Sequence, residues 1–268
     1  MTSENKGTAD MSLSVRQALF TQINSLPHNC GGLSPDAIGI WQLLLETQKR
    51  ENIRGDMLEI GVLEGAAAAM MVTGLNPGEQ LVGIDIALQR HAIENCVTKV
   101  DPQGLSKLSL HEGDSRQMWR TGMLDAWRGR CRFLHIDGEH SYDAVRSDLE
   151  LCEQLMTGDG IIAVDDVLSA ESVCVTHALF DHLRDRPHRL RMFLCGTNKA
   201  YLCCPSQLGF YREICLNELI PFVEEMTKVK LRLSKNSHAW ELDYLTVANR
   251  GDGSRYMRIG KYLDEKPL

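Results

Sequence analysis

A chain of 268 residues with a net charge of -7 can bury one large core but is poorly suited to nucleic acid, because phosphate binding depends on clustered Lys and Arg. Hydrophobic residues make up 43% of the sequence. No apolar run approaches the roughly 20 residues needed to cross a bilayer. We therefore expect a globular protein without nucleic-acid or membrane partners.

The cysteines and the N-terminal residues indicate the cellular compartment in which we expect the protein. Nine cysteines are scattered without metal-type spacing, and no C-x-x-C pair occurs. The opening "MTSENKGTADMSLSV" lacks the cationic start and apolar block of a signal peptide. This combination predicts reduced thiols in the cytoplasm, most of them packed as small apolar residues.

The first 50 residues divide into a tail and a helical cap. Residues 1–12 are polar and are expected to be a disordered tail. Residues 13–50 contain "VRQALFTQINSL" and "SPDAIGIWQLLLETQKR", whose apolar residues have helical spacing. Ser34 is the expected N-cap of the second helix, with Pro35 at its first position, and Trp41 is expected in the core.

Residues 51–205 show the alternation of an α/β core. The short apolar runs "DMLEIG", "QLVGIDI", "KLSLHEGD", "FLHIDG" and "GIIAVDD" are each followed by a helix-like stretch. This order predicts a parallel sheet with helices on both faces. The segment "LRMFLCGTNKAYLCC" predicts an antiparallel hairpin that turns at residues 196–199.

The last segment, 206–268, is expected to be an extension packed on the core. It contains a helix around "CLNELIPFVEEM" and a strand-like run "AWELDYLTVA". No repeat or flexible linker separates it, so we expect one domain with additions at both ends. The segment from Ser206 is also a candidate dimer interface, which would make the protein a homo-oligomer.

The stretch "LEIGVLEGAAAAMM" suggests a ligand-binding turn at the end of the first strand. Glu59 ends the strand, Gly61 allows a tight turn, and Gly65 would let the backbone approach a ligand closely. The spacing G-x-x-x-G differs from the G-x-G-x-x-G of dinucleotide folds. Glu64 in the same loop disfavours a pyrophosphate and suits a cationic or zwitterionic ligand.

Acidic residues at the next two strand ends extend this pattern to a nucleoside. Asp85 ends the second strand, where a carboxylate accepts hydrogen bonds from ribose hydroxyls. Asp114 and Ser115 follow the third strand and suit the adenine edge. The structural alternative is that such aspartates only cap helices.

The order E-x-G-x-x-x-G, a strand-end Asp and then G-D-S resembles class I S-adenosylmethionine-dependent methyltransferases over roughly residues 50 to 205. The resemblance implies a Rossmann-like, doubly wound sheet of seven strands, mostly parallel with an antiparallel C-terminal hairpin. It also implies S-adenosylmethionine as cofactor. The residues that would contact it are Glu59, Gly61, Gly65, Asp85, Asp114, Ser115 and Asp137.

The stretch "HIDGEHSYDAVRSDLELCEQLMTGDGIIAVDDV" is similar to a narrower branch, the metal-dependent macrocin- and mycinamicin-type sugar O-methyltransferases and the cephalosporin hydroxylase-like proteins. The resemblance implies that Asp137, Asp165 and Asp166 hold a divalent cation, usually Mg²⁺, and that His140 is the general base. Some relatives carry Glu-Asp where this chain has Asp-Asp. Three carboxylates at one sheet edge would repel one another without a cation, and oxygen ligands suit Mg²⁺.

These signals predict an O-methyltransferase that acts on a hydroxyl of a small natural product, such as a sugar or a catechol-like ring. Two other classes stay open: an NAD-type oxidoreductase, and a non-methylating relative that binds a nucleoside or assists a hydroxylase. The acidic residues also have a structural interpretation, because Asp137 and Gly138 can form a turn and the pair at 165–166 can cap a helix.

Four further residues are assigned minor roles. Tyr142 is interpreted as a helix staple, and His111 as a packed strand residue. The stretch "HLRDRPHRLR" is interpreted as a solvated helix end, with Arg186 and Arg189 as candidate contacts for an anionic substrate.

Overall fold

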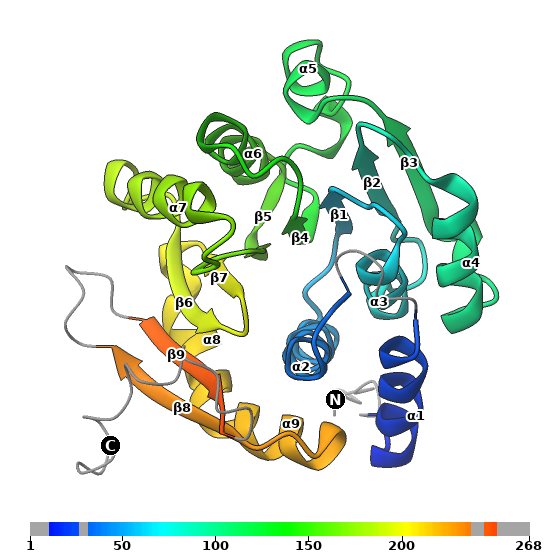
Figure 1. Cartoon of the computed structure of the whole chain (residues 1–268), viewed down its shortest axis with the longest axis vertical. Coiled ribbons are helices and arrows are strands. Elements are labelled where there is room, and N and C mark those ends of the chain that lie inside the picture. The colour runs from blue at the N-terminus through cyan, green and yellow to red at the C-terminus, as the bar shows by residue number, and fades with distance from the viewer. Residues whose placement is uncertain (1–10, 27–31, 237–243, 251–268) are drawn as a thin grey trace, which may run out of the picture.

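One continuous sheet of nine strands organises the protein (Figure 1). The computed structural model describes residues 11–26, 32–236 and 244–250. The strand order is β3-β2-β1-β4-β5-β7-β6-β9-β8. The bounds are β1 (Asp56–Ile60), β2 (Leu81–Asp85), β3 (Leu108–Glu112), β4 (Cys131–Ile136), β5 (Met156–Val164), β6 (Arg191–Gly196), β7 (Lys199–Cys203), β8 (Leu231–Asn236) and β9 (Tyr244–Asn249).

The first five strands are parallel, as predicted. β1 pairs with β2 on one side and with β4 on the other, so the strand order reverses at β1. In doubly wound sheets, ligands bind outside the carboxyl ends of the strands at such a reversal. The fold therefore opens a crevice where β1 and β4 end.

Helices cover both faces of the sheet, as the alternating pattern requires. On one face α2 (Pro35–Arg50) packs with α1, α3 and α9, and the core on this face includes Trp41, Phe133 and Tyr211. On the other face α5, α6 and α7 cover Leu58, Leu134 and Ile162. The helices are α1 (Leu13–Asn24), α2 (Pro35–Arg50), α3 (Ala66–Gly74), α4 (Arg90–Val100), α5 (Ser115–Arg120), α6 (Tyr142–Leu155), α7 (Val173–Asp185), α8 (Leu208–Ile214) and α9 (Ile220–Thr227). Short helical turns lie at η1 (Gly104–Lys107), η2 (Asp125–Trp127) and η3 (Pro205–Gln207), and a π-helical turn, η4 (Cys215–Leu219), joins α8 to α9.

Local signals account for two of these elements. Ser34 caps α2, because its Oγ accepts a hydrogen bond from the backbone N–H of Ala37 at 3.3 Å, and Pro35 begins the helix. The β6–β7 hairpin turns through Thr197 and Asn198, both with positive φ (54° and 64°). Two consecutive residues of positive φ match the right-handed twist of the flanking strands. The predicted hairpin is confirmed.

Among the residues that the structure describes, the sheet has nine strands rather than the seven expected. β9 pairs in parallel with β6, and β8 pairs antiparallel with β9. β8 has the sequence LRLSKN, with only two large apolar residues among charged and polar ones. Such a pattern suits an edge strand, whose outer side faces water, and gives only a weak strand signal.

The ends of the chain are described only in part. Most of residues 1–12, the expected disordered tail, and all of 251–268 lie outside the described residues. Eight of the cysteines are described; all eight are free thiols, and six of them are buried. Within the described ranges, no helix combines the length and the apolar character needed to cross a membrane.

Candidate active site

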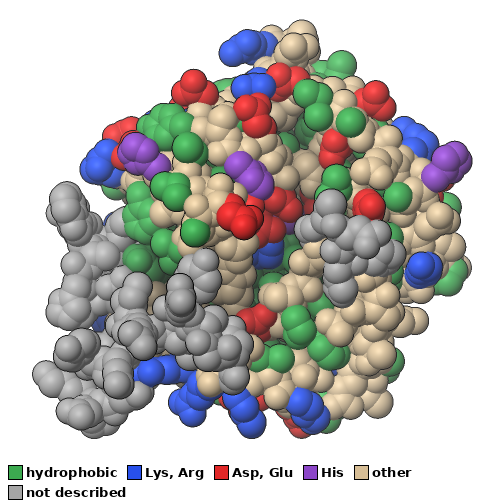
Figure 2. All heavy atoms as spheres, viewed as in Figure 1, with side chains coloured by type: hydrophobic (Ala, Val, Ile, Leu, Met, Phe, Trp, Pro, Cys, Tyr) green, Lys and Arg blue, Asp and Glu red, His purple; other side chains and the backbone are tan. Residues whose placement is uncertain are grey.

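A cleft of about 730 Å³ lies at the carboxyl ends of the central strands. Its lining combines residues that follow β1 to β5 with the β6–β7 turn and with Ser34 near the start of α2. Figure 2 shows acidic side chains gathered at the centre of this face, beside a histidine. The lining includes seven acidic side chains but only one Arg and one Lys, Arg116 and Lys199, besides His140. The cleft therefore favours a ligand that carries positive charge.

The predicted nucleoside residues line one part of this cleft. The carboxylate of Asp85 is fixed by the backbone, because its oxygens accept hydrogen bonds from the N–H groups of Leu63 and Ala87, both at 2.8 Å. Asp114 accepts a hydrogen bond from the N–H of Arg116 at 2.9 Å and so caps α5. Asp114 is thus a helix cap that also faces the cleft.

The two glycines of the first turn have different roles. Gly61 lines the cleft with φ +87°, and a Cβ at this position would overlap the carbonyl group of Asp137. Its missing side chain lets the β1–α3 turn touch the β4–α6 loop. Gly65 also has φ +87°, but a Cβ there would lie 2.8 Å from Cα of Ile93 in α4, and Gly65 does not line the cleft. The absence of a side chain at Gly65 therefore makes room for α4, and its approach to a ligand stays a prediction.

Glu59 lies beneath the cleft and not in its lining. Its side chain is 1% exposed, and Oε1 is 3.0 Å from Nδ1 of His135 in β4. Burial raises the pKa of Glu59 above its ordinary value. Glu59 therefore supports His135 in the structure, and its contact with the cofactor stays a prediction.

Asp137, His140 and Asp166 meet at the rim of the cleft. Nε2 of His140 is 3.6 Å from a carboxylate oxygen of Asp137, and Nδ1 is 3.3 Å from one of Asp166. Ser172 Oγ lies 3.1 Å from Nδ1 of His140 and donates a hydrogen bond to Asp166, also at 3.1 Å. The Asp137 carboxylate raises the pKa of His140, and Asp166 adds to this effect against the opposing effect of burial.

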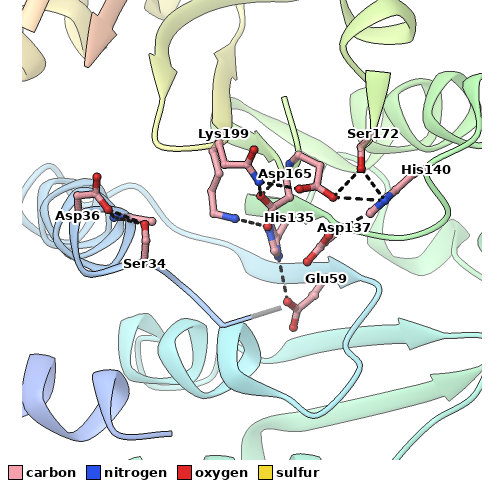
Figure 3. Close-up of polar contacts among 12 residues, drawn as sticks. Ser34, Asp36, Glu59, His135, Asp137, His140, Asp165, Ser172 and Lys199 are labelled. Carbon is pink, nitrogen blue, oxygen red and sulfur yellow. Dashed lines mark hydrogen bonds and ion pairs between the residues drawn. The ribbon is translucent and has the colours of Figure 1, made fainter. Parts of the chain in front are cut away.

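The third predicted carboxylate, Asp165, pairs with two buried basic residues, Lys199 and His135. Lys199 Nζ donates to Oδ2 of Asp165, and Nε2 of His135 lies 3.6 Å from the same oxygen (Figure 3). Although burial opposes ionisation, Lys199 and then His135 hold the pKa of Asp165 well below its ordinary value. Burial also opposes a charge on His135, yet the carboxylates of Asp165 and Glu59 raise its pKa to about 9.

Sequence reasoning missed several residues of this site. Lys199 and Asn198 belong to the hairpin turn, and Asn198 Nδ2 donates to Asp166 at 2.6 Å. A signal for both was present: β7 runs antiparallel to β5, so β7 must begin at the edge where β5 ends. Asp148 of α6 was also missed; it lines the cleft and accepts a hydrogen bond from Ser115 at 2.6 Å. Burial raises the pKa of Asp148 to about 6, although the hydrogen bond from Ser115 opposes this change.

The donor groups fit a divalent cation in part. Asp137 can share an ion with His135 and Asp165, or with His140 and Asp166, because in each group one ligand atom per residue lies within 4.8 Å of the others. The three predicted carboxylates do not form such a group together. Two carboxylates with remaining sites for water are nevertheless a common arrangement for Mg²⁺.

The arginines suggested as contacts for an anionic substrate point elsewhere. Arg186 and Arg189 both reach the carboxylate of Glu153, at 3.1 and 3.4 Å. Glu153 also accepts a hydrogen bond from Nε2 of the buried His182, at 2.8 Å. Neither arginine lines the cleft. They anchor the end of α7 to α6.

Three other residues have structural roles. Tyr142 donates a hydrogen bond to Asp181 at 2.9 Å and ties α6 to α7, as expected of a staple. His111 is half-buried in β3, with Nε2 at 2.9 Å from Ser109 Oγ. Trp41 is fully buried, with its ring 4.7 Å from that of His135.

Comparisons with known proteins agree with this geometry. Residues 58–167 match the family model of a methyltransferase domain. No curated protein shows significant sequence similarity to the chain. Among solved structures, the chain is similar to CalS11, a TDP-rhamnose 3'-O-methyltransferase of calicheamicin biosynthesis, with 18% identity and a TM-score of 0.50 over 75% of this chain and 99% of that one. It is also similar to the O-methyltransferase NovP, with 13% identity and a TM-score of 0.51 over 70% of this chain and 88% of that one.

At such identities the structural likeness establishes the fold, and the family model adds the class of domain. The matched segment runs from β1 to the loop after β5 and contains Gly61, Asp85, Asp137 and Asp165. The doubly wound sheet with its antiparallel hairpin is confirmed as well. Residues 58–167 therefore match a methyltransferase domain, and the chain shares the fold of the O-methyltransferases CalS11 and NovP.

Proposed function

We propose that this protein transfers the methyl group of S-adenosylmethionine to a hydroxyl of a small natural product, such as a sugar or a catechol-like ring. The reaction would need a divalent cation bound among Asp137, Asp165 and Asp166, and His140 would be its general base. The observation that carries the proposal is the position of His140 beside Asp137 and Asp166, at the rim of a cleft that also contains Asp85, Asp114 and Ser115. CalS11 and NovP, which share the fold, are O-methyltransferases.

The cleft suits S-adenosylmethionine on two grounds. A sulfonium zwitterion brings positive charge, which the acidic lining favours and which a pyrophosphate lacks. Asp85 is held by two backbone N–H groups in a position to accept hydrogen bonds from ribose hydroxyls. When bound, the cofactor would supply the electrophilic methyl group.

The hydrogen bonds around His140 define its role. Ser172 donates to Asp166, so its oxygen is free to accept from Nδ1–H of His140. This arrangement favours the tautomer that leaves Nε2 as the basic nitrogen, directed toward Asp137. Nε2 would take the acceptor's proton while the acceptor oxygen bonds to the methyl carbon, whose bond to the sulfonium sulfur breaks to leave S-adenosylhomocysteine. The side chain of His140 is 43% exposed, which leaves room for an acceptor.

A cation at these carboxylates would lower the pKa of the acceptor hydroxyl and hold it toward His140. Asp137 and its neighbours would fix the position of the hydroxyl, and the buried strand ends beneath them would keep that position rigid. Positioning and proton removal are then the chain's own contributions to the rate.

The test uses labelled S-adenosylmethionine with a panel of hydroxylated sugars and catechols, with EDTA or with added Mg²⁺. We expect methyl transfer that EDTA abolishes and Mg²⁺ restores. His140→Ala should lower turnover by about 100-fold or more and leave S-adenosylhomocysteine affinity unchanged. His91, which is 99% exposed on α4, provides the matched control as His91→Ala.

Full turnover in His140→Ala would refute the assignment of the base. Binding of S-adenosylhomocysteine without transfer to any acceptor would instead support the non-methylating alternative. Binding of NAD in place of S-adenosylhomocysteine would support an oxidoreductase.

A further inference from the structure

We infer that Lys199 acts as the permanent counter-ion of Asp165, so that the divalent cation of the proposed reaction is held by Asp137 and Asp166 alone. The inference depends on the proposed function for the presence of a cation. It narrows the expected set of three carboxylates to two and gives Asp165 a positioning role.

Lys199 requires a charged partner because it is buried. The residue is 4% exposed at the start of β7, and its ammonium lies 5.7 Å from the centre of the Trp41 ring. An ammonium removed from water is costly unless an opposite charge compensates it. The carboxylate of Asp165 supplies that charge through direct contact with Nζ. A metal ion bound to Asp165 would compete with Lys199 for the negative charge of this carboxylate.

Both oxygens of Asp165 already have donors. Oδ2 accepts a hydrogen bond from Nζ of Lys199, and Oδ1 accepts one from the backbone N–H of Asp166 at 2.8 Å. His135 lies behind this pair, with Nε2 at 3.6 Å from Oδ2 and Nδ1 bonded to Glu59. Glu59, His135, Asp165 and Lys199 thus form a row in which acidic and basic groups alternate (Figure 3). Such a row compensates its own charges.

Asp137 and Asp166 have no such compensation. Within the described part of the chain, no Lys or Arg forms an ion pair with either carboxylate, and His140 is the basic group between them. Asp166 receives only neutral donors besides His140, from Asn198 at 2.6 Å and Ser172 at 3.1 Å. Oxygens of Asp137 and Asp166 lie within 4.8 Å of each other. Two carboxylates carry the charge that one divalent cation neutralises, and Mg²⁺ commonly binds one or two carboxylates and fills its other positions with water.

The inference predicts how each substitution changes Mn²⁺ affinity, measured by electron paramagnetic resonance of free Mn²⁺ in the presence of S-adenosylhomocysteine. Asp137→Asn and Asp166→Asn should each weaken binding by tenfold or more. Lys199→Met should tighten binding by about tenfold, because it releases Asp165 as a third ligand. Lys199→Arg, which keeps the charge, should bind Mn²⁺ like the wild type.

Asp165→Asn alone leaves a buried ammonium unpaired and can prevent folding, so the decisive variant is the double substitution Asp165→Asn with Lys199→Met. This variant removes both charges, and its Mn²⁺ affinity should stay within threefold of the wild-type value. A tenfold loss in the double variant, or unchanged affinity in Lys199→Met, would overturn the inference. So would a wild-type protein that binds no Mn²⁺ at millimolar concentration.

These measurements separate the inference from the proposed function. Mn²⁺ binding is measured at equilibrium and without an acceptor, so it does not depend on methyl transfer. If no acceptor is methylated but the affinities follow the expected order, the proposed reaction fails and the two-carboxylate site stands. If methyl transfer occurs but the double variant loses Mn²⁺ affinity tenfold, as expected when Asp165 is a third ligand, only the inference fails.

Discussion

Asp148 makes a pH-dependent contribution to stability that can be worked out from its surroundings. The side chain is 2% exposed, and one carboxylate oxygen accepts the hydroxyl of Ser115 at 2.6 Å. Burial raises its pKa from 3.8 to about 6, against the opposing effects of Ser115 and Arg116. The folded chain therefore holds this proton at pH values where the unfolded chain has released it.

The sign and size of the effect follow from this difference. Below pH 3.8 the group is protonated in both states and costs nothing. Between pH 3.8 and about 6 the unfolded chain ionises first, so the free energy of unfolding falls as pH rises. Above pH 6 the full cost of about 3 kcal/mol is present, since each tenfold change in proton affinity corresponds to ~1.4 kcal/mol.

Asp148→Asn removes the charge and keeps an oxygen that can accept from Ser115. We expect the variant to match the wild type near pH 4 and to be more stable by about 3 kcal/mol at pH 8. The free energy of unfolding would be measured from urea denaturation at pH 4, 5, 6, 7 and 8, followed by the fluorescence of the four tryptophans. A difference between variant and wild type that does not change with pH would refute the reasoning.

A control on the same helix separates burial from helix effects. Asp143 is exposed in the first turn of α6. Asp143→Asn should change stability by less than about 1 kcal/mol. Burial would not be the cause if the stability of Asp143→Asn relative to the wild type rose between pH 4 and pH 8 as much as that of Asp148→Asn.

Three further substitutions test other parts of the structure. Gly61→Ala should lower the free energy of unfolding in urea by ~2 kcal/mol more than Gly78→Ala. The two sites have φ of +87° and +85°, but only a Cβ at Gly61 meets other atoms, so equal losses would contradict this explanation. Arg132→Met should lower the free energy of unfolding by about 3 kcal/mol, since the fully buried guanidinium pairs with Glu79 at 2.9 Å, and a neutral result would mean that the pair adds no stability. Tyr142→Phe should leave turnover within twofold, whereas a tenfold loss would place the hydroxyl in the reaction.

Strand periodicity and strand ends were sufficient to predict the central fold. Each of the five apolar runs became a parallel strand, and the residues after them reached one edge because parallel strands end there. This is why Asp85, Asp114, Asp137 and Asp166 could be expected to line one cleft. β8 could not be predicted with the same ease, because an edge strand exposed on one side carries few apolar residues.

The sequence did not reveal which side chains of different elements contact each other. Asp165 was expected to face a cation, but its partner Lys199 stands 34 positions later in a turn that looked purely structural. Gly65 had a backbone requirement that was predicted, but the atoms it makes room for belong to α4. Periodicity places a residue on an element and on a face, whereas a contact between two elements also depends on their separation and on side-chain direction.

The contact between Gly61 and the Asp137 carbonyl joins two loops mechanically. The peptide N–H of Gly61 is bonded to Ile84, that of Asp137 is bonded to Ile60, and no side chain separates the two turns. One turn lies beside Asp85, and the other leads to His140, the proposed base. Displacing either loop must therefore shift the other, so that exchange of the proposed methyl donor and exchange of the proposed acceptor would be coupled.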